Sequence, residues 1–486
     1  MIKYDSIEKY SRIHPNKPAL IDKNGVLSWA EFRYATYKLI SVISLSNSIE
    51  GNPCLYISRN SNSLALLGAA FSTLGIPFQG LDYHLDMERL NDLVKLLNVK
   101  NIFISNEFKN KLNDISGCEV HCIETYVDEV KIKLDDHNSD NIQINNNPIK
   151  NYVFTFGADG TPKTGCRTDS FEKKLFQSLQ SKYSFNGNDI HLICMPMHHA
   201  SSLIWMKLFL LLGCTVVICN YENNYNLYEI MHRHNISTTI LSPMILKEVV
   251  EGLNQEDKEI YFPALRFIIT CGKNYTMRLK HDAINVLGNI IHEYYGSPET
   301  GINTILDSDK TLKYPGSVGC ELEGNKIKII NDNNETLTLE TIGRIAINSY
   351  MNMDDYVEDT AEFVLLDGEK YLLTSDYGYK NAEGYLFVVK RGNHSSFINN
   401  HIIYGLENEL LNLTYLFDVH VYAHDEKSIS CINVIPKNYQ PSSKIRSDIK
   451  AISQKYGISE PVININSELD YTLTGKLNHQ YIHGHC

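Results

Sequence analysis

Short apolar segments typical of strands alternate with longer amphipathic segments through the first part of the chain. The strand-like segments lie at residues 54–58, 77–81, 101–105, 190–194, 215–218, 237–241, 264–271 and 290–294. The helix-like segments between them lie at residues 62–74, 86–98, 169–183, 225–234, 244–252 and 276–287. Strands that alternate with helices favour a mostly parallel sheet with helices on both faces. We therefore expect an α/β fold for this part of the chain.

The pattern changes near residue 316, where strands and turns replace the helices. Strand-like segments at residues 326–330, 343–348, 362–366, 371–374 and 385–389 predict an antiparallel sheet or a small barrel. Beyond Arg391-Gly392-Asn393 the pattern is of α+β type. We expect a large N-terminal domain of residues 1–390, with a β-rich subdomain at about 316–390, and a small C-terminal domain of residues 391–486.

Residues 151–168 (NYVFTFGADGTPKTGCRT) place a glycine-rich segment after an apolar strand. Glycines let the backbone approach a ligand closely, and successive N–H groups form a cradle for anions. Lys163 adds a point charge at the rim of such a cradle. The segment is not a Walker A loop, because Pro162 stands where that motif needs a second glycine. It predicts a loop that wraps a polyphosphate, and a plain glycine-rich turn is the alternative.

The composition is that of an ordinary globular chain and argues against some partners. The formal net charge of −12 disfavours a nucleic acid as the main partner. The N-terminus lacks the apolar region of a secretory signal, and the most apolar run, residues 208–218, is too short to span a bilayer. The 11 cysteines show no paired spacing, which fits a reducing compartment. We expect a cytoplasmic protein with no membrane segment.

Polar residues beside predicted strands and tight turns mark further candidate positions. Glu299 lies in a glycine-flanked turn after an apolar strand. Open α/β sheets bind ligands at the carboxyl ends of such strands, so Glu299 could contact a ligand. The alternative is an acidic turn residue that faces solvent. Asp376, at a strand end, could accept both ribose hydroxyls or could form an Asx turn. Arg391 ends an apolar run, Lys476 sits in a tight loop and His199 follows a strand. Taken singly, each of these also fits an ordinary surface or core role.

Eight segments, taken in order, resemble the signature motifs of the adenylate-forming superfamily of acyl-CoA and aryl-CoA ligases, amino-acid adenylation domains and luciferases. They are FTFGADGTPKTG, PMHHASSL, ALRFIITCGKNY, EYYGSPETG, YPGSVGCELEGNKIKII, YLLTSDYGYKNAEGYLFVVKRGN, IIYGLENEL and TLTGKLNH. The first resembles the family's phosphate loop, TSGTTGxPKG, and the last resembles its terminal TxxGKxxR loop. One such match is weak, whereas eight collinear matches are strong.

The resemblance implies an activity and a set of ligands. A carboxylic acid would be activated with ATP and Mg²⁺ as an acyl-adenylate, with release of pyrophosphate. The acyl group would then pass to a thiol, either of CoA or of the phosphopantetheine on an acyl or peptidyl carrier protein. The small C-terminal domain would be mobile and would rotate about a hinge near residues 391–394, at Asn393, between the two steps.

The resemblance also implies roles for individual residues. Lys476, Glu299 and His199 would be the catalytic residues, with Glu299 as the Mg²⁺ ligand and Lys476 bridging the substrate carboxylate and the α-phosphate. Tyr295 would stack on the adenine. The residues implied to bind the nucleotide are Thr155, Gly157, Gly160, Thr161, Lys163, Gly272, Tyr295, Gly296, Asp376 and Arg391. The residues implied to border the acid pocket are His199, Gly272 and Lys273.

Several positions depart from the family pattern. Ala158-Asp159 replace two hydroxyl residues of the phosphate loop, and Asp159 brings negative charge to a place meant for phosphates. Asn400 stands where a glycine lines the thiol channel. These departures leave open a second hypothesis, a degenerate homologue that binds a nucleotide or acyl-adenylate without turnover and acts as a scaffold or regulator. A third hypothesis is an enzyme that oxidises its adenylate with oxygen. PMHHASSL lacks the aspartate that amino-acid-activating members use, which favours an acyl or aryl acid; Lys273 could pair with a second substrate carboxylate or face solvent or ATP.

Overall fold

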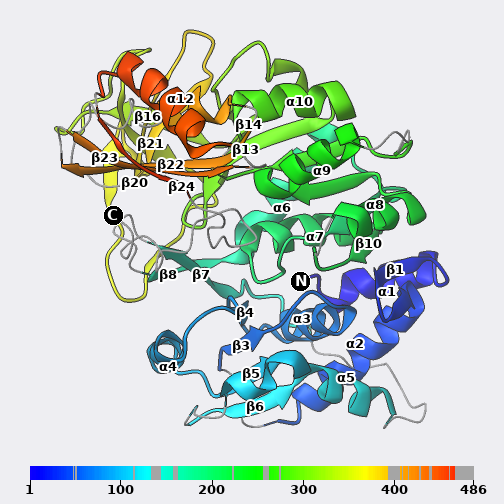
Figure 1. The fold of residues 1–486 in the computed structure, drawn as a ribbon. Coiled ribbons are helices and arrows are strands. Elements are labelled where there is room, and N and C mark those ends of the chain that lie inside the picture. Colours follow the sequence, from blue (N-terminus) through cyan, green and yellow to red (C-terminus); the bar gives the residue numbers. More distant parts are fainter. Residues whose placement is uncertain are drawn as a thin grey trace.

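The computed structural model shows parallel sheets with helices in the first part of the chain and antiparallel sheets toward its C-terminal end (Figure 1). It describes all residues except 47–48, 50–51, 113–114, 116, 133–143, 157–161, 222–223, 256–261, 273–274, 392–404, 408, 414, 426–427, 437–439, 459 and 466–486. Among the helices that it describes, none is long and apolar enough to cross a membrane.

The largest sheet has nine strands in the order β15-β14-β13-β12-β11-β9-β10-β1-β2. Its strands are β1 (Pro18–Asp22), β2 (Gly25–Ser28), β9 (Ile190–Ile193), β10 (Thr215–Ile218), β11 (Thr238–Leu241), β12 (Phe267–Thr270), β13 (Ile291–Ser297), β14 (Gly301–Leu306) and β15 (Cys320–Glu321). The strands from β13 to β1 in this order run parallel, whereas β2, β14 and β15 pair antiparallel at the edges. The prediction of a mostly parallel sheet is confirmed.

A second, parallel sheet of four strands has the order β4-β3-β5-β6. Its strands are β3 (Cys54–Ile57), β4 (Phe78–Gly80), β5 (Asn101–Ile104) and β6 (Glu119–Cys122). One hydrophobic core joins it to the larger sheet, with Phe71 and Phe103 packed in the same cluster as Trp205 and Phe267. The lower, blue-to-cyan part of Figure 1 contains this second sheet.

Helices cover both faces of the larger sheet, as the alternating pattern predicts. The helices are α1 (Tyr4–Ile13), α2 (Trp29–Ile43), α3 (Asn62–Leu74), α4 (Met87–Leu96), α5 (Ile123–Ile132), α6 (Glu172–Tyr183), α7 (Ala200–Leu211), α8 (Asn224–Arg233), α9 (Pro243–Gln255) and α10 (Met277–Leu287), with short 3₁₀ turns at Asn106–Leu112, Asp169–Phe171 and Ser308–Lys310. A second core, with Leu246 of α9 and Leu279 of α10 against Leu192 and Ile268 of the sheet, lies under α8, α9 and α10.

Local sequence signals fix several of these helices. Ser28 caps α2 by accepting a hydrogen bond from the backbone N–H of Glu31, and the Glu31 carboxylate accepts one from the Ser28 backbone at 2.8 Å, which completes a capping box. The α3 helix ends at Gly75, whose φ of 74° is the left-handed conformation that glycine adopts without strain. Both signals place the helix ends where the sequence predicts them.

A separate three-stranded sheet, β18-β8-β7, carries the glycine-rich segment. Strands β7 (Lys150–Phe156) and β8 (Pro162–Thr168) form an antiparallel hairpin with Thr155 opposite Lys163. Strand β18 (Asp355–Tyr356) pairs with the other edge of β8. The sequence predicts β7 but not β8, whose strand conformation comes from partners on both sides.

The chain beyond residue 316 forms an antiparallel sheet and then a small α+β region with a mixed sheet. The first is five-stranded, with β16 (Lys326–Ile330), β17 (Gly343–Asn348), β19 (Phe363–Leu366), β20 (Glu369–Lys380) and β21 (Leu386–Arg391). The second contains β22 (Leu416–Asp425), β23 (Ser428–Pro436) and β24 (Val462–Ile465), together with α12 (Ser442–Lys455). The predicted fold class is confirmed. The predicted domain boundary at 390–393 includes residues that the structure does not describe, so it stays a prediction.

Candidate active site

Glu299 occupies the turn between β13 and β14, at the carboxyl end of a parallel strand. The turn is held by a hydrogen bond from the Met353 backbone N–H to the Glu299 carbonyl at 2.7 Å. The Tyr356 hydroxyl donates to Oε1 of the Glu299 carboxylate at 3.4 Å. Gly296 cannot be replaced without movement, because a Cβ there would lie 1.9 Å from the Gly301 carbonyl oxygen. The structure therefore presents a half-buried carboxylate where the sequence predicts one.

Lys163 lies on β8 and contacts the same tyrosine, Tyr356, as the Glu299 carboxylate. Its ammonium nitrogen pairs with Asp359 Oδ2 at 2.6 Å and lies 5.1 Å from the centre of the Tyr356 ring. Thr155 faces Lys163 across the hairpin and is buried. Its hydroxyl lies next to that of Tyr356, yet it makes no well-formed hydrogen bond within the described residues. A buried hydroxyl without such a bond is expected where a ligand completes the site.

Two acidic side chains reach the glycine-rich segment from the far end of β18, and sequence reasoning missed both. Glu358 accepts a hydrogen bond from the Thr164 backbone N–H at 2.6 Å, and Asp359 pairs with Lys163. The hydrogen bond from Lys163 holds the pKa of the Asp359 carboxyl below its usual range. The acid-rich run DDYVED was the available signal, but nothing in the sequence assigns it to this loop. These carboxylates contact groups that a phosphate would also contact.

Asp376 and Tyr295 form a buried pair close to the β-rich sheet. The Tyr295 hydroxyl donates to Asp376 Oδ2 at 2.7 Å, and the two residues are 3% and 9% exposed. The Tyr295 ring packs in a cluster with Ile327 and Ile345. Arg391 is the direct cross-strand partner of Asp376 in the pairing of β20 with β21. The structure thus brings three of the predicted nucleotide-binding residues together, although a ring so deeply buried offers little surface for an adenine.

His199 and Gly272 follow β9 and β12, two strands of the larger sheet that are separated by β11. His199 is the N-cap residue of α7, and Gly272, with a φ of 116°, follows β12. The Asn60 side chain fixes the loop before His199, because its Oδ1 accepts from the Met197 backbone N–H at 2.7 Å. Burial lowers the pKa of the adjacent His198 to about 4, so that ring is neutral at pH 7. His199 and Gly272 therefore both follow the carboxyl ends of parallel strands of this sheet.

Other predicted site residues lie outside the described residues. These are Gly157, Gly160, Thr161, Lys273, Asn393 and Lys476. The same holds for Asp159 and Asn400, the two departures from the family pattern. Their roles stay predictions.

The residues around Glu299 fit a magnesium ion that is shared with a nucleotide. Mg²⁺ prefers oxygen ligands and is commonly held by one or two carboxylates together with substrate phosphates and waters. Glu299 supplies such a carboxylate, and its Oε1 is the atom that the Tyr356 hydroxyl approaches. Within the described part of the chain no group of three or more His, Cys, Asp or Glu residues forms a complete metal cage. A Mg²⁺ ion held by this carboxylate would therefore need oxygen atoms of a phosphate as further ligands.

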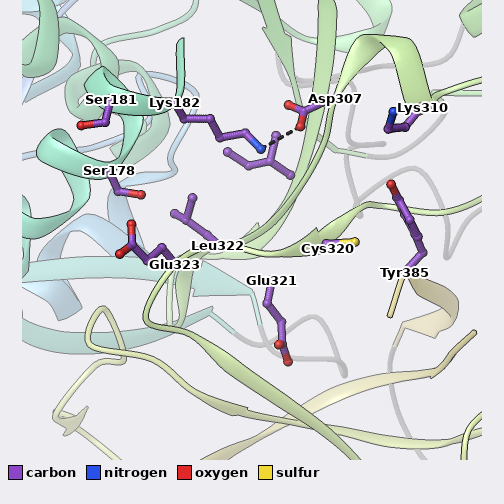
Figure 2. A pocket seen from close by; sticks show the side chains of 11 residues that line it. Ser178, Ser181, Lys182, Asp307, Lys310, Cys320, Glu321, Leu322, Glu323 and Tyr385 are labelled. Atoms are coloured by element: carbon purple, nitrogen blue, oxygen red, sulfur yellow. Dashed lines mark hydrogen bonds and ion pairs between the residues drawn. The ribbon is translucent and has the colours of Figure 1, made fainter. Parts of the chain in front are cut away.

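A surface hollow of about 450 Å³ lies apart from these residues, between α6 and the β14–β15 edge. Figure 2 shows Lys182 of α6 reaching toward Asp307, with an ion pair of 2.7 Å between them. Burial alone would raise the pKa of the Asp307 carboxyl, but hydrogen bonds from His292, Lys182 and Tyr183 bring it well below its usual range. Among the predicted site residues that the structure describes, none lines this hollow.

Comparison with known proteins agrees with the resemblance in motifs. Residues 7–357 match the family model described as AMP-binding enzyme. The chain is 20% identical to a fatty acid–[acyl-carrier-protein] ligase of Streptomyces coeruleorubidus, over 82% of this chain and 79% of that protein.

Solved structures give the same fold. The o-succinylbenzoate CoA synthetase of Bacillus subtilis, in complex with its acyl-adenylate intermediate, matches with a TM-score of 0.81 at 18% identity, covering 97% of this chain and 96% of that chain. The same synthetase is also known in complex with ATP and a magnesium ion. The amide bond synthetase of Marinactinospora thermotolerans matches with a TM-score of 0.80 at 16% identity, covering 98% and 99%. Since the family model covers most of the chain, this protein belongs to the AMP-binding enzyme family, whose members form adenylates.

Proposed function

We propose that this protein activates a carboxylic acid as an acyl-adenylate, with release of pyrophosphate, and then transfers the acyl group to a thiol. The observation that carries the proposal is that Lys163 and Glu299 both contact Tyr356. Adenylation needs a phosphate-binding cation and a Mg²⁺ ligand close to each other. The motif resemblance and the family assignment support the same reaction.

In the first step an oxygen of the substrate carboxylate attacks the α-phosphorus of ATP, and the bond to the pyrophosphate oxygen breaks. Both reactants are negative, so catalysis consists mainly of positioning and charge neutralisation. Lys163 would neutralise a phosphate oxygen, and Glu299 would hold Mg²⁺, which supplies further positive charge between the phosphates. Asp376, kept in place by Tyr295, would accept hydrogen bonds from the ribose.

The acid would enter beside His199 and Gly272, and an acyl or aryl acid fits the motif there. In the second step the sulfur of a thiol attacks the acyl carbon, AMP leaves, and the thiol gives up its proton. The names of similar proteins include a CoA synthetase, an acyl-carrier-protein ligase and an amide bond synthetase. CoA and a carrier-protein phosphopantetheine are the acceptors that we propose.

The alternative is a homologue that binds nucleotide or acyl-adenylate without turnover, as a scaffold or regulator. The contacts of Asp359 with Lys163 and of Glu358 with Thr164 favour it, because these carboxylates compete with phosphates for the loop. In the sequence, Asp159 and Asn400 also favour this alternative, because both depart from the family pattern.

ATP–pyrophosphate exchange with a panel of acyl and aryl acids tests the proposal. We expect exchange with at least one acid, and a loss of roughly 10²–10³-fold in Lys163→Ala and in Lys476→Ala, the range for removal of one charge-stabilising group. Lys328→Ala is the matched control, because Lys328 also pairs with an exposed aspartate, Asp367, but lies on β16. Absence of exchange with every acid, in protein shown to be folded, would contradict the proposal. Tight ATP binding without exchange would support the alternative.

A further inference from the structure

Tyr356 contacts both of the side chains that we propose to act on the phosphates and the metal. Its hydroxyl donates to Glu299 Oε1 at 3.4 Å, and the Lys163 ammonium lies 5.1 Å from the centre of its ring. Lys163 comes from β8 and Glu299 from the turn after β13, which are far apart in the sequence. Tyr356 is therefore a physical link between the two halves of the candidate site.

The backbone of Tyr356 is fixed to the phosphate-loop strand. Tyr356 pairs with Gly165 of β8, and the flanking Val357 N–H donates to the Thr164 carbonyl at 2.8 Å. A Cβ on Gly165 would approach Met353 Sδ and a Val153 methyl, each at 2.9 Å, so a side chain there would disturb this pairing. As a result, the Tyr356 ring keeps its position relative to Lys163.

The chemistry of the hydroxyl suits an anchor for a carboxylate. A phenol hydroxyl carries its proton at neutral pH, so the Tyr356 hydroxyl can donate to the carboxylate. The hydrogen bond uses Oε1, one of the two oxygens of the Glu299 carboxylate. The ring, with its negative face toward Lys163, attracts the ammonium without neutralising it.

We propose that Tyr356 is a positioning residue for adenylation, which holds the Glu299 carboxylate and the Lys163 ammonium at a fixed separation so that metal and phosphate meet. This inference rests on the proposed function. It assigns Tyr356 a role through the two side chains that it contacts, Glu299 and Lys163.

Tyr356→Phe tests the role of the hydroxyl, and Tyr356→Leu tests the hydroxyl and the ring together. Tyr356→Phe should raise the Mg²⁺ concentration for half-maximal exchange about 2- to 10-fold, the effect of one hydrogen bond, with KM for ATP unchanged at saturating Mg²⁺. Tyr356→Leu should also raise that KM about 2- to 5-fold, because the cation–π contact is lost. The same shifts are expected in calorimetric titrations of the protein with ATP and Mg²⁺, which need no turnover.

The chain contains a matched control at Tyr371. Its hydroxyl donates to Glu369 at 3.4 Å, and the Lys328 ammonium lies 5.4 Å from its ring centre. Tyr371→Phe should leave the Mg²⁺ dependence unchanged.

Four outcomes would overturn the inference. The first is an unchanged Mg²⁺ dependence in Tyr356→Phe, and the second is an equal shift in Tyr371→Phe. The third is a Tyr356→Phe effect that persists in full when Glu299 is already changed to Gln, since the effect must pass through that carboxylate. If the wild-type protein shows no exchange, the proposed function fails, whereas the calorimetric comparison still decides the role of Tyr356. A Tyr356→Phe protein that does not fold would overturn a role confined to positioning.

Discussion

Replacing Tyr295 by phenylalanine removes one oxygen atom and separates two roles for this side chain. The family resemblance implies that the ring stacks on the adenine, and phenylalanine would keep that interaction. The structure instead buries the ring, leaving it 3% exposed, and directs its hydroxyl to Asp376 Oδ2 at 2.7 Å. If the hydroxyl keeps Asp376 ready for the ribose, Tyr295→Phe should weaken ATP binding. If stacking is the main role, ATP binding should hardly change.

The size of the effect follows from the burial of the pair. A hydrogen bond to a charged group contributes about 1.5–3 kcal/mol, and phenylalanine cannot donate this bond to the buried carboxylate. Asp376 is 9% exposed, so water replaces the lost donor poorly. The free energy of unfolding should therefore fall by about 1.5–3 kcal/mol. ATP affinity should fall by up to the same free energy, roughly 10- to 100-fold.

Urea unfolding measures the first quantity and calorimetry with ATP and Mg²⁺ the second. Tyr228→Phe is the control, because the Tyr228 hydroxyl is also buried and donates to the Val249 carbonyl at 2.6 Å, far from the candidate site. It should lose stability and keep ATP affinity. A double-mutant cycle of Tyr295→Phe with Asp376→Asn should give a coupling free energy above about 0.5 kcal/mol. Unchanged ATP affinity in Tyr295→Phe, together with additive effects in the cycle, would refute the reasoning.

Three further predictions concern charge and burial. Lys280→Met leaves the buried Glu293 carboxylate without its cation and should lower the free energy of unfolding by about 3–5 kcal/mol in urea; a change below about 1 kcal/mol would contradict this. Asp359→Asn should tighten ATP binding by at most about fivefold at low salt, because Asp359 competes with phosphate for Lys163, and the gain should vanish at high salt. Burial lowers the pKa of His191 to about 3. Below pH 6.5 the His191 imidazole therefore binds a proton in the unfolded chain, whereas in the folded chain it stays neutral until the pH is much lower. Unfolding free energy should fall by about 2 kcal/mol from this group between pH 7 and pH 5, and His191→Phe should remove that part of the pH dependence; an identical pH dependence in the variant would show the assignment to be wrong.

The sequence predicts those parts of the fold whose signals are local. Strand β10 lies where its apolar run predicts it, and α3 ends at the predicted glycine, because burial and a left-handed turn act within a few residues. Strand β8 was missed because Pro162, Gly165 and three threonine or lysine neighbours carry no strand pattern of their own. Its conformation depends on pairing with β7 and β18.

The same distinction holds for the candidate site. Lys163 and Glu299 stand in recognisable motifs, so the sequence points to them directly. Tyr356, Glu358 and Asp359 lie nearly two hundred positions from the loop that they contact, with separations of 194 and 196 residues for the two acids. A contact over such a separation leaves no trace in a single sequence, because it depends on how β18 docks on β8.

The charged side chains near the glycine-rich segment also change which acids matter most for phosphate binding. The sequence draws attention to Asp159, inside the loop, as the acid that opposes phosphate binding. In the described part of the site, Glu299, Glu358 and Asp359 lie near the cations Lys163 and Arg167, and Asp359 forms an ion pair with Lys163. We therefore expect a nucleotide, with its several negative charges, to enter together with a divalent cation and to displace Asp359 from Lys163. Nucleotide and Mg²⁺ should therefore bind with positive coupling, each raising the affinity for the other by the same factor.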